Sequence, residues 1–204
     1  EMMEYPDIDG QDAPGKASQL LPMLAGRVTR STKSGGRIML AGSLFQLRWD
    51  GQGEIPNATA LGWGISFTGR EYFGRAKHYF FWNTSYGQGW GSNIASGIGG
   101  KTAATLNPDG DLKTMPALNL GAGLAFNLVD NLVMNLSSMW FEIDPSPTRG
   151  PNMYKGGYAN HINLIWSPMK KVNVGIEYMF LKRVNTDENS GTGRRLQMMV
   201  KYTL

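Results

Sequence analysis

Apolar and polar side chains alternate with a period of two in nine separate runs of this sequence. Clusters of Gly, Pro, Asn and Asp bound the runs, which cover residues 21–30, 37–49, 58–69, 76–88, 116–127, 131–142, 156–166, 171–182 and 194–204. Such alternation is typical of β-strands with one face against an apolar medium and the other against water. The pattern therefore predicts an all-β protein built from amphipathic antiparallel strands.

The composition agrees with strands that cross a lipid bilayer. Of 204 residues, 27 are glycine and 41% are hydrophobic, and no stretch approaches the roughly 18 continuous apolar residues of a transmembrane helix. A membrane strand needs only about ten residues, of which alternate ones face lipid, so a barrel keeps a polar overall composition. We therefore expect an antiparallel transmembrane β-barrel in the lipid of the bacterial outer membrane.

The connections between the runs alternate in length. Short connections lie at 32–36, 70–75, 128–130 and 167–170, and longer ones at 50–57, 89–115, 143–155 and 183–193. Outer-membrane barrels have short periplasmic turns and long external loops, so this rhythm places the C-terminus on the periplasmic side. Segment 89–115 is long enough either to fold into the lumen as a constriction or to remain an external loop.

Residues 1–19, which are rich in Asp and Pro, are expected to form an exposed loop, with residues 20–204 as barrel strands. Nine strands is an odd number, whereas single-chain bacterial barrels close with an even one. We therefore expect the C-terminal portion of a larger barrel. A small closed barrel of eight or ten strands, acting as an enzyme or adhesion module, is the alternative, and a soluble lipocalin-like binder is a third possibility.

Aromatic residues near the strand ends are expected to form two girdles, because amphipathic rings prefer the membrane interfaces. The expected outer girdle contains Trp49, Trp140, Tyr178 and Phe180. The expected inner girdle contains Phe67, Phe126, Trp166 and Tyr202.

Parity along each run assigns side chains to the lumen, where basic groups outnumber acidic ones. The pore-lining candidates are Arg27, Arg48, Lys77, His161, Glu177, Arg195 and Lys201. Such a lining lowers the energy of an anion in a narrow pore. We expect Arg27, Arg48 and Arg195 to contact solute, since a guanidinium can hold a carboxylate through two parallel hydrogen bonds. The alternative for each is an ion pair that merely supports the wall.

The sequence contains no motif that points to catalysis. It has no cysteine, and His78 and His161 lie on separate runs without a carboxylate at metal-ligand spacing. No serine is placed beside a histidine and an orienting acid. The net charge of +4 comes from scattered Lys and Arg. We therefore expect no enzyme activity, cofactor, metal or nucleic-acid partner.

Several segments together resemble one known family. The most specific is YANHINLIWSP at 158–168, and the others are 40–42, 46–48, 62–64, 86–89, 110–112, 172–178 and 195–197. They are similar to the C-terminal half of the DcaP-like porins, and the resemblance covers nearly the whole chain.

The resemblance implies a sixteen-stranded, trimeric outer-membrane channel of Gram-negative bacteria that admits small anionic solutes such as dicarboxylates. In that family an N-terminal helical segment precedes the barrel, and this sequence matches neither that segment nor the first half of the barrel. The barrel assembly machinery is expected to recognise the last strand, although Leu204 stands where most barrels place Phe or Trp.

Overall fold

Long antiparallel strands make up most of the protein in the computed structural model, which describes residues 7–10, 12–91, 102–143 and 152–203. All nine predicted runs are strands. They are β3 (Leu24–Ser31), β4 (Arg37–Gly51), β5 (Ala58–Phe73), β6 (His78–Gln88), β9 (Pro116–Val129), β10 (Leu132–Ile143), β11 (Tyr154–Met169), β12 (Val172–Asn185) and β13 (Ser190–Tyr202). Among the described residues, no helix is long and apolar enough to cross a bilayer.

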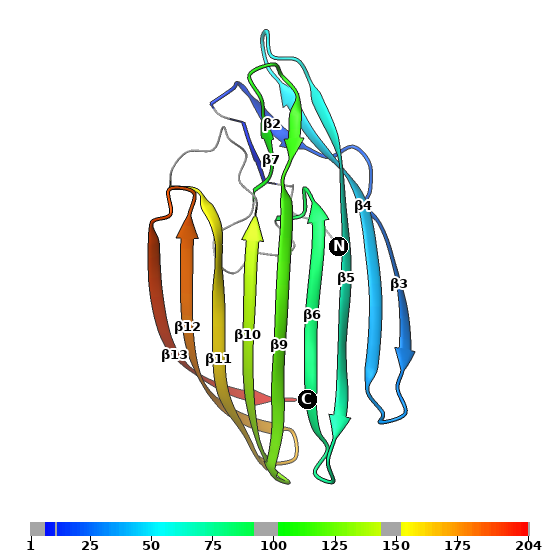
Figure 1. Ribbon diagram of the computed structural model, residues 1–204, viewed down its shortest axis with the longest axis vertical. Coiled ribbons are helices and arrows are strands. Elements are labelled where there is room, and N and C mark those ends of the chain that lie inside the picture. The colour runs from blue at the N-terminus through cyan, green and yellow to red at the C-terminus, as the bar shows by residue number, and fades with distance from the viewer. Residues whose placement is uncertain (1–6, 11, 92–101, 144–151, 204) are drawn as a thin grey trace.

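The strands form one curved wall (Figure 1). Their order is β13-β12-β11-β10-β9-β6-β5-β4, and every neighbouring pair is antiparallel. Beyond β4, strand β3 pairs with its lower part and the short strand β2 (Gly15–Ser18) with its upper part. Within the described residues β3 and β13 do not pair with each other, so the wall is an open part of a barrel.

The tight turns lie together at the lower end of the wall in Figure 1, and the longer connections lie at the upper end. One connection at the upper end, expected over 183–193, is short instead of long. Strand β12 continues to Asn185 and β13 begins at Ser190, with Val184 opposite Ser190. The prediction of a long loop is wrong because a strand that extends beyond the bilayer can be polar on both faces.

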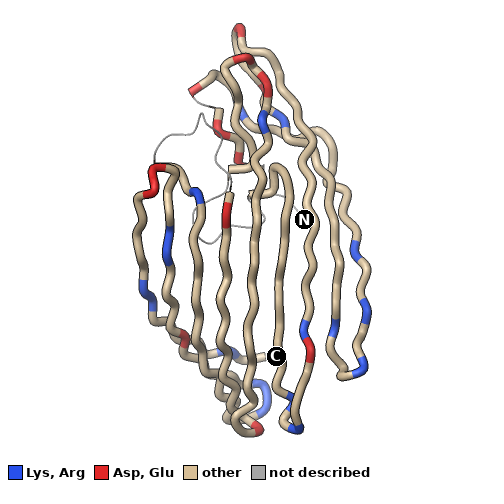
Figure 2. The backbone as a smooth tube through the Cα atoms, in the orientation of Figure 1, with Lys and Arg blue, Asp and Glu red and all other residues tan. Residues whose placement is uncertain are grey.

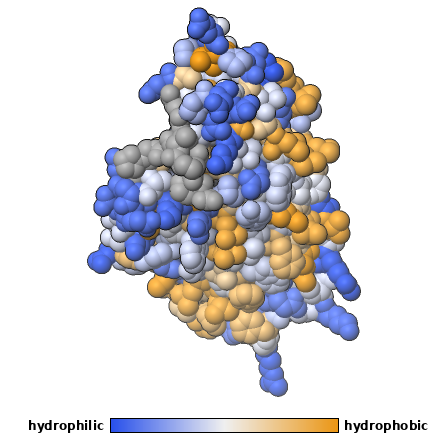
Figure 3. Space-filling model, turned by 45° about the horizontal axis from the view of Figure 1, so that its top comes forward, coloured by the Kyte–Doolittle hydropathy of each residue, from blue (hydrophilic) through white to orange (hydrophobic). Residues whose placement is uncertain are grey.

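The ladder of paired residues separates the wall into two faces. The outer face, defined as the face that carries Leu61, presents exposed apolar side chains along its length, including Leu24, Val28, Leu40, Ile162, Leu196, Met198 and Val200. Hydrophobic residues cover much of the surface below the hydrophilic upper end (Figure 3). An apolar face of this extent is what lipid contact requires.

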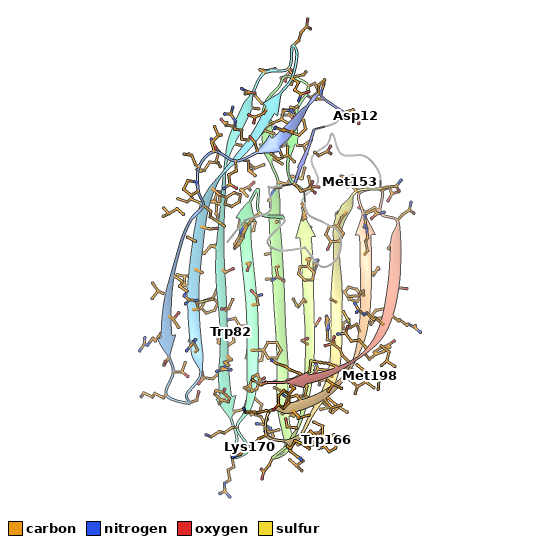
Figure 4. The ribbon with its side chains drawn as sticks, turned by 180° about the vertical axis from the view of Figure 1, so that it is seen from behind. Asp12, Trp82, Met153, Trp166, Lys170 and Met198 are labelled. Atoms are coloured by element: carbon orange, nitrogen blue, oxygen red, sulfur yellow. The ribbon has the colours of Figure 1, made fainter. Side chains whose placement is uncertain are left out.

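Aromatic residues of the outer face gather in two groups. The upper group, nine to twelve residues above the tight turns, contains Trp63, Tyr86, Trp140, Tyr158 and Phe180, and the lower group contains Phe73, Phe80, Trp82, Phe126, Trp166 and Tyr202. Figure 4 shows two of the lower group, Trp82 and Trp166, toward the end that carries Lys170.

The two groups have the spacing of the girdles of an outer-membrane barrel. On β11, Tyr158 and Trp166 are separated by about 26 Å along the strand. For a strand tilted by about 35–45° this is roughly 20 Å across the bilayer, somewhat less than the apolar band of about 25 Å of such barrels. Phe67 and Tyr178, assigned to the inner and outer girdle respectively, lie between the groups.

Trp49 is not a girdle residue. It lies on the inner face of the wall and is only 7% exposed. Its ring fills the space above Gly10 and Gly15, where a Cβ atom would collide with it. The assignment to the outer girdle is therefore wrong, because this ring packs against protein rather than lipid.

A small hydrophobic core closes over the inner face at the upper end. Strand β1 (Asp7–Asp9) pairs in parallel with β7 (Thr102–Leu106), which pairs with β8 (Leu112–Thr114). This three-stranded sheet packs on the inner side chains of β4 and β5, in a cluster of Ile8, Phe45, Leu47, Trp49, Ala58, Ala103, Ala104 and Leu106. In place of a plain exposed loop, residues 1–19 thus contain β1 and β2. The described part of 89–115 lies against the inner wall, whereas 92–101 lie outside the described residues.

The substitution Leu47→Ala tests this inner core. Leu47 is fully buried, so its truncation should lower the free energy of unfolding by about 2–5 kcal/mol. Urea unfolding of the refolded protein in detergent measures the change. Leu21→Ala, at a side chain that is 60% exposed, is the control and should cost less than about 0.5 kcal/mol. Equal losses in the two variants would contradict the packing of β7 on β4.

Candidate pore lining

One rung of the ladder brings basic side chains from distant parts of the chain onto the inner face. It runs across nine strands through Ser31, Arg37, Arg70, Phe81, Gly123, Ser137, His161, Met179 and Arg195. We call it the basic rung. It contains three arginines and a histidine and no acidic residue, so it presents a belt of positive charge to whatever occupies the lumen.

The positive charge of the basic rung is densest at Arg37 and Arg70, because these residues lie directly opposite each other on β4 and β5. Like charges in such a cross-strand pair are destabilising unless something neutralises them. Arg70 stacks over the Tyr72 ring at 5.3 Å, and neither arginine forms an ion pair within the described part of the chain. Their charge is therefore available to a solute anion.

Arg27 lines a separate cavity of about 450 Å³ higher on the inner face, together with Ser43, Ser66 and Trp90. The Ser66 hydroxyl is hydrogen-bonded to that of Ser85 at 2.6 Å. The buried Ser43 hydroxyl has no hydrogen-bond partner among the described residues. That hydroxyl oxygen is inaccessible to solvent, so a small anion in this cavity would be held by the Arg27 guanidinium.

The opposite part of the inner face carries a hydrogen-bonded polar row across β10 to β13. Asn135 donates to Asn163 (2.7 Å), and Glu177 accepts hydrogen bonds from Asn163 (3.1 Å) and Gln197 (2.6 Å). His161 Nδ1 also lies 3.5 Å from the Glu177 carboxylate. Three side chains thus contact the Glu177 carboxylate, and these contacts partly shield its negative charge from the lumen.

Arg48 does not lie where parity placed it. It shares the outer face with Leu40 and Leu44, and its guanidinium donates to Asp50 Oδ1 at 2.5 Å. Gln46 lies on this same face. The expectation that Arg48 lines the lumen is wrong. The apolar side chains that alternate with it, such as Leu47, face the inner core rather than lipid.

Four other predicted residues are distributed along the inner face. Arg195 lies on the basic rung, and Lys201 lies nearer the lower end of the same strand, opposite Asn173. Glu177 and His161 are in contact, as described above. Lys77 lies in the turn between β5 and β6 with a positive φ of 52°, so it belongs to the lower rim rather than to the wall.

Sequence reasoning missed Arg37 and Arg70. Arg70 follows the predicted run 58–69 by one residue, although the strand continues to Phe73. Arg37 is the first residue of the predicted run 37–49, and the parity that points Arg48 toward the lumen points Arg37 away from it. Extending the alternation of β5 to its tight turn would find Arg70, and the opposite parity for β4 would find Arg37.

Arg183 shows what a structural arginine looks like on this face. It donates to Asn185 (2.8 Å) and to the Asn152 carbonyl (3.2 Å), and its guanidinium lies 5.6 Å from the centre of the Tyr154 ring. Burial raises the pKa of Tyr154 to about 12, although the charge of Arg183 opposes this. The tyrosine therefore remains a neutral stacking partner, and Arg183 is held by the wall.

Known structures share this arrangement of strands. The outer membrane channel DcaP of Acinetobacter baumannii superposes with a TM-score of 0.78 at 17% sequence identity. This chain has the fold of the DcaP channel. The matched region covers 97% of this chain and 56% of the DcaP chain, so the protein spans little more than half of that channel's length.

The NanC porin is also similar, with a TM-score of 0.50 and 10% identity over 89% of this chain and 93% of that one. No family model and no curated protein sequence matches the chain. The likeness therefore rests on the strand arrangement of the DcaP fold.

Replacing Glu177 tests the electrostatic balance of this inner face. Glu177→Gln removes the negative charge but keeps a side chain that can hydrogen-bond to Asn163 and Gln197. We expect the anion-to-cation permeability ratio to rise about two-fold, equivalent to about 0.4 kcal/mol, as measured by reversal potential under a salt gradient. Glu142→Gln, on the outer face, is the control and should change nothing. A fall in the ratio with Glu177→Gln would contradict the assignment.

Proposed function

We propose that this chain forms part of a porin in the bacterial outer membrane through which small anionic solutes diffuse passively. The observation that carries the proposal is the basic rung on the inner face of a wall with the DcaP fold. A porin performs no covalent chemistry, and its selectivity comes from pore width and from the charges that line the lumen.

The charge of the inner face supports anions as the permeant class. Within the described long strands, its fixed charges are those of Arg27, Arg37, Arg70, Arg183, Arg195, Lys201 and Glu177, so cations exceed anions. Apolar surroundings strengthen the field of these groups inside a narrow aqueous channel. An anion entering from water is therefore stabilised, and a cation is repelled.

Dicarboxylates are the solute class that we propose within this group. Each guanidinium can receive one carboxylate through two parallel hydrogen bonds. The direct pairing of Arg37 with Arg70 offers two such forks side by side, which matches a short molecule with two carboxylates. Arg27 and Arg195 extend the same field along the wall.

The working pore requires more strands than the described wall contains. Free N–H and C=O groups along an open strand edge cannot remain unpaired in hydrocarbon. We propose that further strands pair with the outer edges of β3 and β13 to complete a larger barrel. The resemblance to DcaP-like porins supports a homotrimer of such barrels, assembled through recognition of β13 by the barrel assembly machinery.

A small closed barrel acting as an enzyme or an adhesion module fits less well. It would need β13 to pair with β3, and these two strands do not pair with each other in the described part of the chain. Strand pairing thus favours the larger pore.

Reversal potentials of the pore in planar bilayers test the proposal. The native pore should prefer chloride over potassium, and Arg37→Ala and Arg70→Ala should each lower this preference about two- to five-fold, because each removes a charge from the lumen. Arg48→Ala is the matched control on the outer face of β4 and should leave selectivity unchanged. A cation-selective native pore, or an equal effect of Arg48→Ala, would refute the assignment.

A further inference from the structure

The outer face has a cavity that the transport account does not use. It has a volume of about 510 Å³ and lies over β11, between side chains of β10 and β12. Ser138, Trp140 and Glu142 line it from β10, Tyr158 and Asn160 from β11, and Lys182 from β12. Gly156 and Gly157 also line the cavity and contribute no side chain to it.

The register places rings, polar groups and cations of this cavity on two adjacent rungs. Trp140, Tyr158 and Lys182 lie on one rung, and Ser138, Asn160, Phe180 and Arg194 on the next. Trp140 is 57% exposed, and the Tyr158 and Phe180 rings lie 5.9 Å apart. These rings belong to the upper aromatic group, so the cavity lies at the level of the membrane interface that faces the cell exterior.

Positive charge crosses the upper wall diagonally beside this cavity. Figure 2 shows basic residues on β11, β12 and β13, each lower than the one before. They include Lys155, Lys182 and Arg194, of which Lys155 is paired with Glu188. Lys182 and Arg194 are diagonal neighbours on one face, and neither forms an ion pair among the described residues. Two unneutralised cations at an interface attract a phosphate group.

We propose that this cavity binds the phosphorylated sugar headgroup of an acylated glycolipid in the outer leaflet. The Trp140 and Tyr158 rings offer apolar faces to a sugar ring, and Ser138, Asn160 and Glu142 can hydrogen-bond its hydroxyl groups. Lys182 and Arg194 bind the phosphate through charge-assisted hydrogen bonds. The acyl chains then extend down the apolar outer face, over side chains such as Ile162.

The proposal rests on the proposed function in one respect, the orientation that turns the upper end toward the cell exterior. A second protein subunit is a poorer fit to the cavity. The centre of a protein interface is depleted of charged residues, whereas Glu142, Lys155 and Lys182 all line this hollow. A phosphorylated sugar headgroup instead matches the cations Lys182 and Arg194 through its phosphate and the rings of Trp140 and Tyr158 through its sugar.

The test measures binding of a bisphosphorylated, acylated glucosamine disaccharide to the purified full-length protein in neutral detergent by native mass spectrometry. Arg194→Ala and Lys182→Ala should each weaken binding at least five-fold, and the dephosphorylated disaccharide should bind at least ten-fold more weakly than the phosphorylated form. The matched control is Arg195→Ala, whose side chain is on the inner face of the same strand and should not affect binding.

Equal binding of both disaccharides, or equal weakening by Arg194→Ala and Arg195→Ala, would overturn the proposal. So would dissociation of the purified oligomer by Lys182→Ala, because the cavity would then be a subunit contact. Reversal potentials of Lys182→Ala and Arg194→Ala separate the two claims. Unchanged anion selectivity without glycolipid binding defeats only this inference, whereas a cation-selective native pore defeats the proposed function itself.

Discussion

The structure depends on one constraint, which is that backbone N–H and C=O groups in hydrocarbon must pair within the protein. Antiparallel strands meet this requirement through ladders of hydrogen bonds, and the ladder forces neighbouring side chains onto opposite faces. Lipid contact on one face then requires apolar residues there, so the opposite face is free to carry charge. The separation of Leu61 and Ile65 from Ser66 and Thr68 on β5 follows directly from this geometry.

Register converts residues that are far apart in the sequence into one functional surface. Arg37 and Arg195 are separated by most of the chain, yet seven successive strand pairings place them on the same rung with Arg70 and His161. The same register gathers Trp140, Tyr158 and Lys182 on the outer face. A shift of one residue in a single strand would exchange the two faces of that strand and interrupt both surfaces.

The strands could be predicted from the sequence because period-two alternation persists wherever one face meets lipid. Prediction failed at the upper end, where the environment changes. There the apolar residues of β4, such as Leu47, face the core under β7, so alternation assigned Arg48 and Trp49 to the wrong faces. Beyond the bilayer both faces of β12 and β13 meet water, so their ends resembled a loop. Long-range contacts of this kind leave no local signal in one sequence.

The central claim is that one face of the wall meets water and the other meets lipid within the same strand. The chain contains no cysteine, so single cysteines placed at Phe67 and Thr68, adjacent on β5, can report each face separately. The account predicts that a charged, membrane-impermeant maleimide labels Thr68→Cys and leaves Phe67→Cys unlabelled in outer-membrane vesicles. Labelling of Phe67→Cys with protection of Thr68→Cys would show that the proposed lumen is a sealed interior, and the pore account would fail.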